Sequence, residues 1–203
     1  MSTLYKQASI KISELNFDEI LIPEILINQG EHYRIELGIS HHSKIGLLRR
    51  ILEKESSIQN VATFKTLKEN NRIETLLFST TIEGYFLKNN ISLEKIESLI
   101  ENYNLNSYQK VRKETKLKHL PEQELRFFKI FILMQSHKKI FIDTGGMYVS
   151  VLIMTYKLIR DFLECGGIVI ELAYPHFSEN SEYDPFTTKN MRTIKVGEMR
   201  ILQ

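Results

Sequence analysis

Residues 119–143 read HLPEQELRFFKIFILMQSHKKIFID, and this stretch decides the fold that the sequence predicts. Pro121 suits the first turn of a helix, which continues through LRFFKIFILMQSH. The short apolar run KKIFID follows at once and ends in an acid, Asp143. The stretch therefore predicts a helix followed by an inner strand, with a carboxylate at the end of that strand.

The downstream sequence again predicts a helix followed by a strand. A long helix is expected over about 147 to 165, and it stops at Gly166-Gly167, as helices often do. The run GIVIEL, residues 167–172, is typical of another buried strand. The tail TIKVGEMRILQ predicts a hairpin with its turn at Gly197-Glu198.

The upstream sequence predicts a different kind of sheet. Residues 8–37 alternate as short antiparallel strands, break at Gln29-Gly30-Glu31, and lead into an inner strand, HYRIEL, that ends at Gly38. The middle of the chain, about 64 to 120, is helical and polar, with Ser92 placed to cap a helix. Together these elements predict an α/β sheet with a parallel inner part.

The composition is that of an ordinary globular protein, with 203 residues, 42% hydrophobic residues and a net charge of +2. Charge alone therefore predicts no nucleic-acid partner. No apolar run approaches the ~20 residues that cross a bilayer, and the N-terminus lacks a signal-peptide core. We expect a cytoplasmic protein, whose single cysteine, Cys165, acts as a small apolar filler.

The stretch GISHHSKIGLLRRI, residues 38–51, has the outline of a phosphate-binding loop, GxxxxGK[ST]. Gly38 and Lys44 have the spacing of that loop. Ser43 stands in place of its second glycine, and Ile45 stands in place of the hydroxyl that binds Mg²⁺. The stretch is either a plain strand–loop–helix connection or a weakened nucleotide site. Its two adjacent histidines point differently and have no third ligand, so no metal site is expected.

Taken together, these segments resemble the ATP-binding subunit of an ABC transporter, a member of the P-loop NTPase superfamily. Residues 29–52 resemble the family's Walker A region, residues 74–86 its LFSGTI-type segment, and residues 119–143 its signature motif, helix and Walker B strand. Residues 165–177 resemble the strand that leads to the switch histidine. In the family an arginine lies seventeen residues before the Walker B aspartate, and Arg126 and Asp143 have that spacing.

The resemblance implies a single ABC-ATPase-like domain, residues 1–203, with N-terminal antiparallel strands and a small helical subdomain at about 68–120. It also gives a set of vestigial candidates for nucleotide binding: Gly38, Ser43, Lys44, Asp143 and His176. Tyr174 aligns with the switch position as well as His176 does. Asp143 is either a remnant of the Mg²⁺-orienting acid or a carboxylate that caps the turn into Gly145-Gly146.

The remaining catalytic positions depart from the family. Thr144 follows Asp143 where the family has a glutamate that polarises water. Residues 119–123 replace the signature LSGGQ, Ile73 replaces the Q-loop glutamine, and the D-loop positions 147–150 lack their acid. The sequence therefore predicts a protein that is not an enzyme and has no cofactor, although weak ATP binding stays open.

We expect a structural or regulatory subunit of a transporter that pairs with an active ATPase subunit or a membrane permease, as a homo- or heterodimer at the inner face of the membrane. The docking surface is expected within residues 70–90, including Phe78, Tyr85 and Phe86, which could instead form subdomain core. Two alternatives remain. One is a non-hydrolysing nucleic-acid clamp that uses the basic run 110–119, and the other is a weak nucleotide sensor that uses Lys44.

Overall fold

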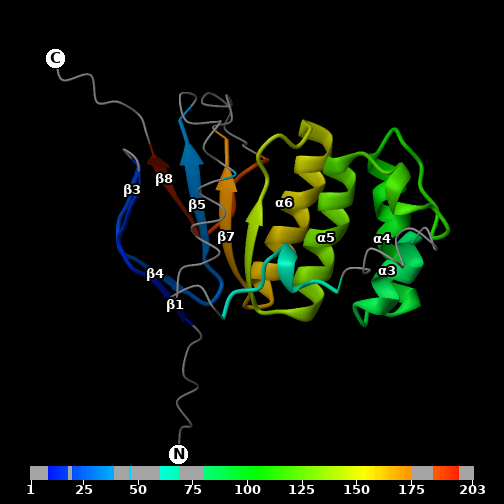
Figure 1. Cartoon of the computed structure of the whole chain (residues 1–203), viewed down its shortest axis with the longest axis horizontal. Helices are drawn as coiled ribbons and strands as arrows, with labels where there is room; N and C mark the ends of the chain where they lie inside the picture. Colours follow the sequence, from blue (N-terminus) through cyan, green and yellow to red (C-terminus); the bar gives the residue numbers. More distant parts are fainter. Residues whose placement is uncertain are drawn as a thin grey trace, which may run out of the picture.

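A four-stranded parallel sheet lies at the centre of the molecule (Figure 1). The computed structural model describes residues 9–17, 20–38, 46, 60–68, 80–174 and 185–196. The strands are β5 (His32–Leu37), β6 (Lys139–Asp143), β7 (Ile168–Ala173) and β8 (Met191–Val196). Their order is β6-β7-β5-β8, and every neighbouring pair is parallel. The predicted α/β class with a parallel inner sheet is confirmed.

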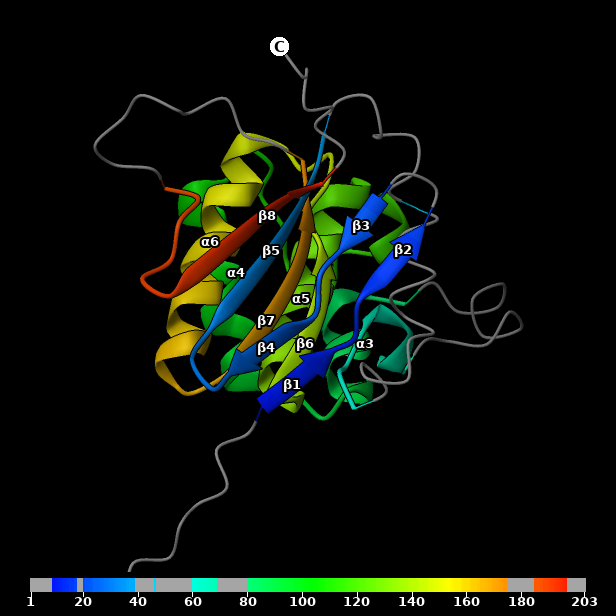
Figure 2. The same ribbon diagram turned by 90° about the vertical axis from the view of Figure 1, so that its left-hand side faces the viewer.

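An antiparallel layer covers one face of this sheet (Figure 2). It contains β1 (Ser9–Ile12), β2 (Leu15–Phe17), β3 (Ile20–Ile22) and β4 (Ile25–Asn28). Strand β1 pairs with β4 and β2 pairs with β3, both antiparallel, as the sequence predicts. A turn at Gln29-Gly30 leads into β5, and Gly30 has a φ of 79°, a conformation that favours glycine.

Helices cover the other face of the sheet. α5 (Glu122–Ser136) and α6 (Val149–Glu164) contact each other and the sheet, and α3 (Ile82–Lys88) and α4 (Leu93–Asn106) lie beyond them (Figure 1). The described residues also form two short 3₁₀ helices, η3 (Phe64–Thr66) and η4 (Leu117–His119). One continuous cluster of buried apolar side chains joins α3, α4, α5 and α6.

Tyr85 and Phe86 belong to this cluster and are buried. The expectation that they form an exposed docking surface is therefore wrong, and the alternative, that they form core, is correct. The reason is that α3 turns this face toward α5, where the Phe86 and Phe128 rings lie 5.9 Å apart edge to face. Phe78 lies outside the described residues.

The ends of the helices agree with the sequence to within a residue or two. Ser92 occupies the N-cap of α4, without a side-chain cap bond, and Pro121 occupies the N-cap of α5 instead of its first turn. α6 ends at Glu164. Cys165 follows as the C-cap and is exposed, so the prediction that it fills the core is wrong.

The C-terminal tail contributes β8, which pairs with β5 at the edge of the parallel sheet. The predicted hairpin turn at Gly197-Glu198 and its second arm lie outside the described residues. The helical subdomain boundaries of about 68–120 stay a prediction, although α3 and α4 both fall within them. Across the described ranges, every helix is too short or too polar to span a lipid bilayer.

Candidate functional site

Two of the predicted site residues, Gly38 and Asp143, lie at the carboxyl ends of the parallel strands, on one side of the sheet. Asp143 pairs in register with Leu172 of β7, and Glu36 pairs with Ala173 two positions before Gly38. Gly38 and Asp143 therefore lie on the same edge, with β7 between their strands. Ligands bind at this edge in open α/β sheets.

The other three predicted site residues, Ser43, Lys44 and His176, lie outside the described residues. Their part in a nucleotide site stays a prediction. Gly38 donates its backbone N–H to the carbonyl of Val196 in β8 at 2.9 Å. This bond fixes the end of β5 to the edge strand.

Asp143 caps the turn that follows β6. Its Oδ1 accepts a hydrogen bond of 2.9 Å from the backbone N–H of Gly145, which is the turn-capping geometry that the sequence offered as one alternative. Nη1 of Arg126 lies 3.9 Å from the same oxygen. The carboxylate is buried and is used to shape the turn.

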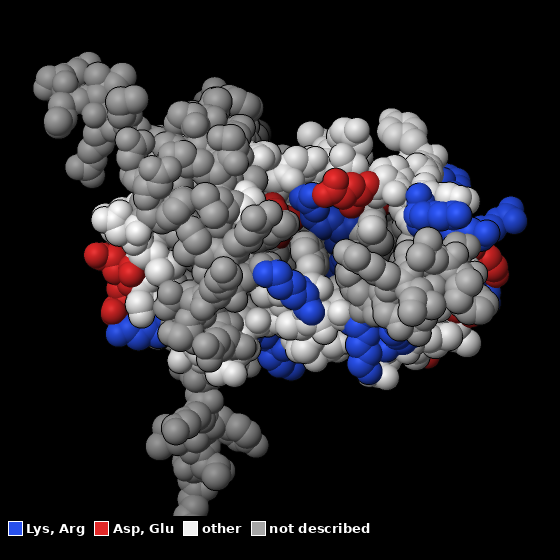
Figure 3. Space-filling view, in the orientation of Figure 1, with Lys and Arg blue, Asp and Glu red and all other residues white. Residues whose placement is uncertain are grey.

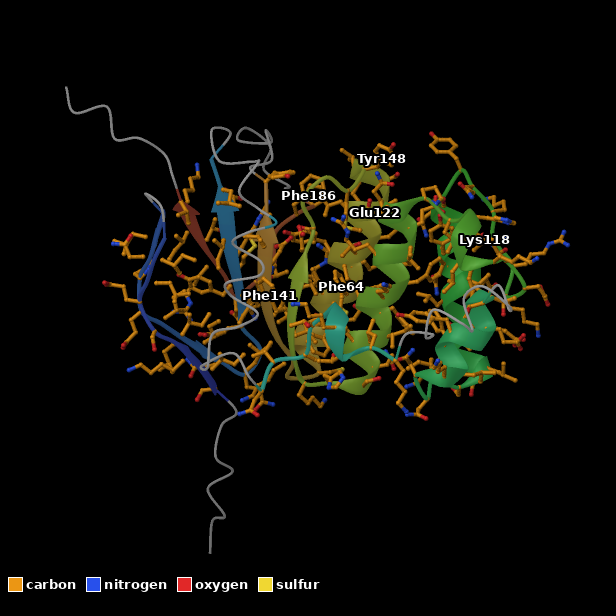
Figure 4. The ribbon with its side chains drawn as sticks, viewed as in Figure 1. Phe64, Lys118, Glu122, Phe141, Tyr148 and Phe186 are labelled. Atoms are coloured by element: carbon orange, nitrogen blue, oxygen red, sulfur yellow. The ribbon has the colours of Figure 1, made fainter. Side chains whose placement is uncertain are left out.

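Arg126 fastens α5 to this turn. Its Nη1 donates to the carbonyl of Gly145 at 2.7 Å and lies 3.4 Å from the carbonyl of Asp143, while Nη2 pairs with Glu122 at 2.9 Å. The seventeen-residue spacing of Arg126 and Asp143 in the sequence is therefore a direct contact in space. Figure 4 labels Glu122 near this end of the sheet.

The side chain of Thr144 points into the protein, toward β7. Its side chain is buried, and its hydroxyl donates a hydrogen bond of 2.5 Å to Oε1 of Glu171 in β7. Its backbone N–H donates to the carbonyl of Leu172 at 3.0 Å. Thr144, the residue after the strand-end Asp143, therefore joins the end of β6 to β7 through both its side chain and its backbone.

Glu171 is the centre of a buried polar network between the sheet and α6. Besides the bond from Thr144, it accepts a hydrogen bond of 2.6 Å from the hydroxyl of Tyr156. Nε2 of His32 lies 2.9 Å from its Oε2, and Nε of Arg34 lies 3.8 Å away. Partners from one strand, one helix and one turn thus converge on a single carboxylate that has no exposed surface.

Arg34 extends this network toward the carboxyl edge of the sheet. Its Nε lies 3.1 Å from Oε1 of Glu36, the next residue on the same side of β5. Its other nitrogens donate to the carbonyls of Phe186, at 3.4 Å, and Tyr174, at 3.3 Å. The guanidinium lies over the ring of Tyr156, 5.9 Å from its centroid. Buried charges need such partners to offset their loss of hydration.

The network changes the pKa of its members. Burial raises the pKa of Glu171, but the hydrogen bond and charge of His32, the charge of Arg34 and the hydrogen bond from Thr144 together lower it to about 2. Burial raises the pKa of Tyr156 well above its ordinary value, and the negative charge of Glu171 raises it further. The carboxylate is therefore ionised and the phenol neutral at any moderate pH.

Sequence reasoning missed this network. In β5 the polar residues His32, Arg34 and Glu36 alternate with apolar ones, which is a readable sign that one face of the strand meets polar groups. Glu171 stands alone in an apolar strand and carries no such sign. The pairing of β7 with β5 and β6, together with the packing of α6 on the sheet, brings it to its partners.

The chain resembles several solved structures. It matches an ABC transporter ATP-binding protein from Pyrococcus furiosus at 11% identity and a TM-score of 0.56, covering 92% of this chain and 97% of that one. It matches an RNase-L inhibitor at 13% identity and a TM-score of 0.54, covering 84% of this chain and 35% of that one. It also matches a bacterial Atm1-family ABC exporter with ATP bound, at 13% identity and a TM-score of 0.51, covering 86% and 36%.

The sequence itself matches no protein-family model, and no curated protein sequence is significantly similar to it. At identities this low the structural similarity shows the fold and leaves the activity open. The described elements, a parallel sheet with an antiparallel layer on one face and helices on the other, therefore have the fold of ABC transporter ATP-binding proteins.

Proposed function

We propose that the protein is a non-hydrolysing ABC-ATPase-like subunit with a structural or regulatory role in a transporter. The observation that carries the proposal is the turn after β6, where the hydroxyl of Thr144 is bonded to the buried Glu171. The resemblance puts the water-polarising glutamate at this position. A hydroxyl is a poor base at neutral pH, and Glu171, with its low pKa and full burial, is a weak base as well.

The start of α5 supports the same proposal. The resemblance puts the phosphate-gripping signature here, and such a site needs small residues at an unobstructed helix N-terminus. Pro121 is the N-cap instead, and the exposed side chain of Glu122 lies in the first turn, paired with Arg126. A carboxylate at a helix N-terminus competes with a phosphate for the same positive potential.

The start of α6 offers a surface for a partner protein. Tyr148 and Val149 are each 64% exposed at positions that the resemblance assigns to the D-loop. Figure 4 labels Tyr148. Neighbouring exposed apolar side chains are typical of protein interfaces. We propose that this surface contacts an active ABC ATPase subunit or a permease, which would hold the protein at the inner face of the membrane.

The first experiment measures Mg-ATP hydrolysis by the purified full chain and by Asp143→Asn. Asparagine keeps an oxygen that can accept the bond from Gly145, so the turn keeps its shape. We expect both proteins to show only background hydrolysis. Magnesium-dependent turnover that Asp143→Asn abolishes would overturn the proposal.

A second experiment tests the partner. Affinity purification from the native membrane should return an intact ATPase subunit or a permease with the full chain, and less of it with Tyr148→Ser. A protein that purifies alone and monomeric would count against the proposal.

Thermal melting with Mg-ATP tests the nucleotide-sensor alternative. A melting temperature that excess nucleotide leaves unchanged would exclude this alternative.

A further inference from the structure

The segment from the last residues of α4 into η4 forms one end of the molecule, at the opposite end from the antiparallel strands (Figure 1). We call residues 105–118 the basic tip. It contains five Lys or Arg residues and one Glu, whereas the net charge of the whole chain is +2, so the rest of the chain is net acidic. Figure 3 shows Lys and Arg side chains gathered at this end. The net positive charge of the protein therefore comes from one short segment.

The basic tip also exposes two large side chains. Tyr108 is fully exposed and Leu105 is 76% exposed, the two most exposed of the large apolar side chains in the described residues. An aliphatic side chain this exposed contributes no burial of apolar surface to the stability of the fold. Leu105 and Tyr108 lie three residues apart in the chain and close in sequence to Lys110 and Arg112, so this short segment combines exposed apolar side chains with cations.

The loop is held in shape by the helix before it. The side-chain amide of Asn104 donates to the carbonyl of Val111 and accepts from its N–H, both at 2.8 Å. Val111 is buried, whereas its neighbours Lys110 and Arg112 are exposed. The ammonium of Lys110 donates to the carbonyls of Asn104 and Ser107, at the C-terminal end of α4. The cations are thus presented on a fixed loop.

Most of the cations in the basic tip are not neutralised by an ion pair within the described residues. Lys113 pairs with Glu97 at 3.3 Å. Within the described part of the chain, no ion pair engages Arg112, Lys116 or Lys118. Figure 4 labels Lys118 at this same helical end of the molecule.

We propose that the basic tip binds the surface of an anionic lipid membrane. Cations attract anionic headgroups, tyrosine suits the headgroup region, and leucine suits the boundary with the acyl chains. A nucleic acid would use the cations and the tyrosine, but it would gain nothing from Leu105. The binding is direct and needs no permease, so the inference does not depend on the proposed function.

The absence of tryptophan from the chain gives a clean test. Tyr108→Trp introduces a single fluorophore at the tip, and Tyr148→Trp introduces a matched one at the start of α6. With protein-free vesicles of phosphatidylglycerol and phosphatidylcholine, the emission of Tyr108→Trp should shift to shorter wavelength. The emission of Tyr148→Trp should not shift, and neither variant should respond to pure phosphatidylcholine.

Charge variants in co-sedimentation complete the test. Changing both Arg112→Gln and Lys118→Gln should lower vesicle partitioning about 25-fold, at about fivefold for each cation. High salt should lower it in the same way. The pair Lys157→Gln and Lys189→Gln removes the same charge from exposed positions elsewhere and should lower it much less.

Three results would overturn the inference. The first is equal binding of the wild type to neutral and anionic vesicles, or to neither. The second is an equal loss for the tip pair and the control pair, since this would reduce the effect to net charge. The third is a salt-sensitive gel shift with single-stranded nucleic acid in the absence of vesicle binding.

Discussion

Thr144 and Glu171 are joined by a hydrogen bond of 2.5 Å that links the end of β6 to the middle of β7. Thr144→Val keeps the shape of the side chain and removes the donor. Because Glu171 is fully buried, one of its oxygens then loses a partner that water cannot replace, and we expect a loss of about 1–3 kcal/mol in the free energy of unfolding. Urea denaturation at neutral pH measures it. Thr193→Val, at an exposed position of β8, should change stability by less than about 0.5 kcal/mol.

Tyr156 is the second hydroxyl donor to Glu171, at 2.6 Å. Tyr156→Phe keeps the ring that packs edge to face on Phe186, so its effect isolates the hydroxyl. We expect a loss of about 1–2 kcal/mol. Because both donors bond one carboxylate, the double variant with Thr144→Val should differ from additivity by about 1 kcal/mol in a double-mutant cycle. Additive losses would show that the two bonds act independently.

The lowered pKa of Glu171 makes stability depend on acid pH. The folded pKa of about 2 lies below the ordinary value of 4.5, so the stabilisation is complete above about pH 4.5 and is lost as the pH falls toward 2. At 1.36 kcal/mol for each pKa unit, the loss is about 3 kcal/mol. Urea denaturation at a series of acid pH values should show a steeper decline for the wild type than for Glu171→Gln, which cannot ionise. Parallel declines would mean that other carboxylates cause the acid sensitivity.

The sequence predicts those parts of the fold that depend on local patterns. The run from Pro121 to Asp143 gave α5 and β6 within a residue, and Gly166-Gly167 gave the end of α6. The contact of Arg126 with the turn followed from a spacing that the resemblance supplied. The partners of Glu171 could not be predicted, because they depend on the strand order β6-β7-β5 and on which face α6 turns to the sheet. The burial of Tyr85 and Phe86 depends in the same way on how α3 meets α5.

Arg126 donates to the carbonyl of Gly145 from one arm of its guanidinium and pairs with Glu122 from the other. Arg126→Lys keeps the charge but has no planar fork, so it cannot reach both partners in the same geometry. We expect unfolding to become easier by about 1–2 kcal/mol, measured by urea denaturation. Glu122→Gln removes only the exposed ion pair with Arg126 and should lower the free energy of unfolding by less than about 0.5 kcal/mol. Equal losses for the two variants would mean that Arg126 stabilises the protein through its pair with Glu122 and not through its bond to the turn at Gly145.

Gly167 lies where α6 gives way to β7, and its missing side chain leaves room for Phe162. A Cβ at this position would lie 2.2 Å from the Phe162 ring, which is buried in the helical core cluster and so has little freedom to move. Gly167→Ala should therefore destabilise the protein by about 2 kcal/mol or more, through a displaced ring and a shifted start of β7.

Gly84 provides the control for this change, because it lies in the first turn of α3, where an added Cβ would approach no atom closer than 3.4 Å. Gly84→Ala should be neutral or should stabilise by up to about 1 kcal/mol, since alanine favours the helix. Thermal denaturation of the two variants, measured side by side, separates the effect of close packing from the general effect of replacing a glycine. A stable Gly167→Ala protein would show that Phe162 can move aside, and the close approach of helix and strand would then not be a requirement of the fold.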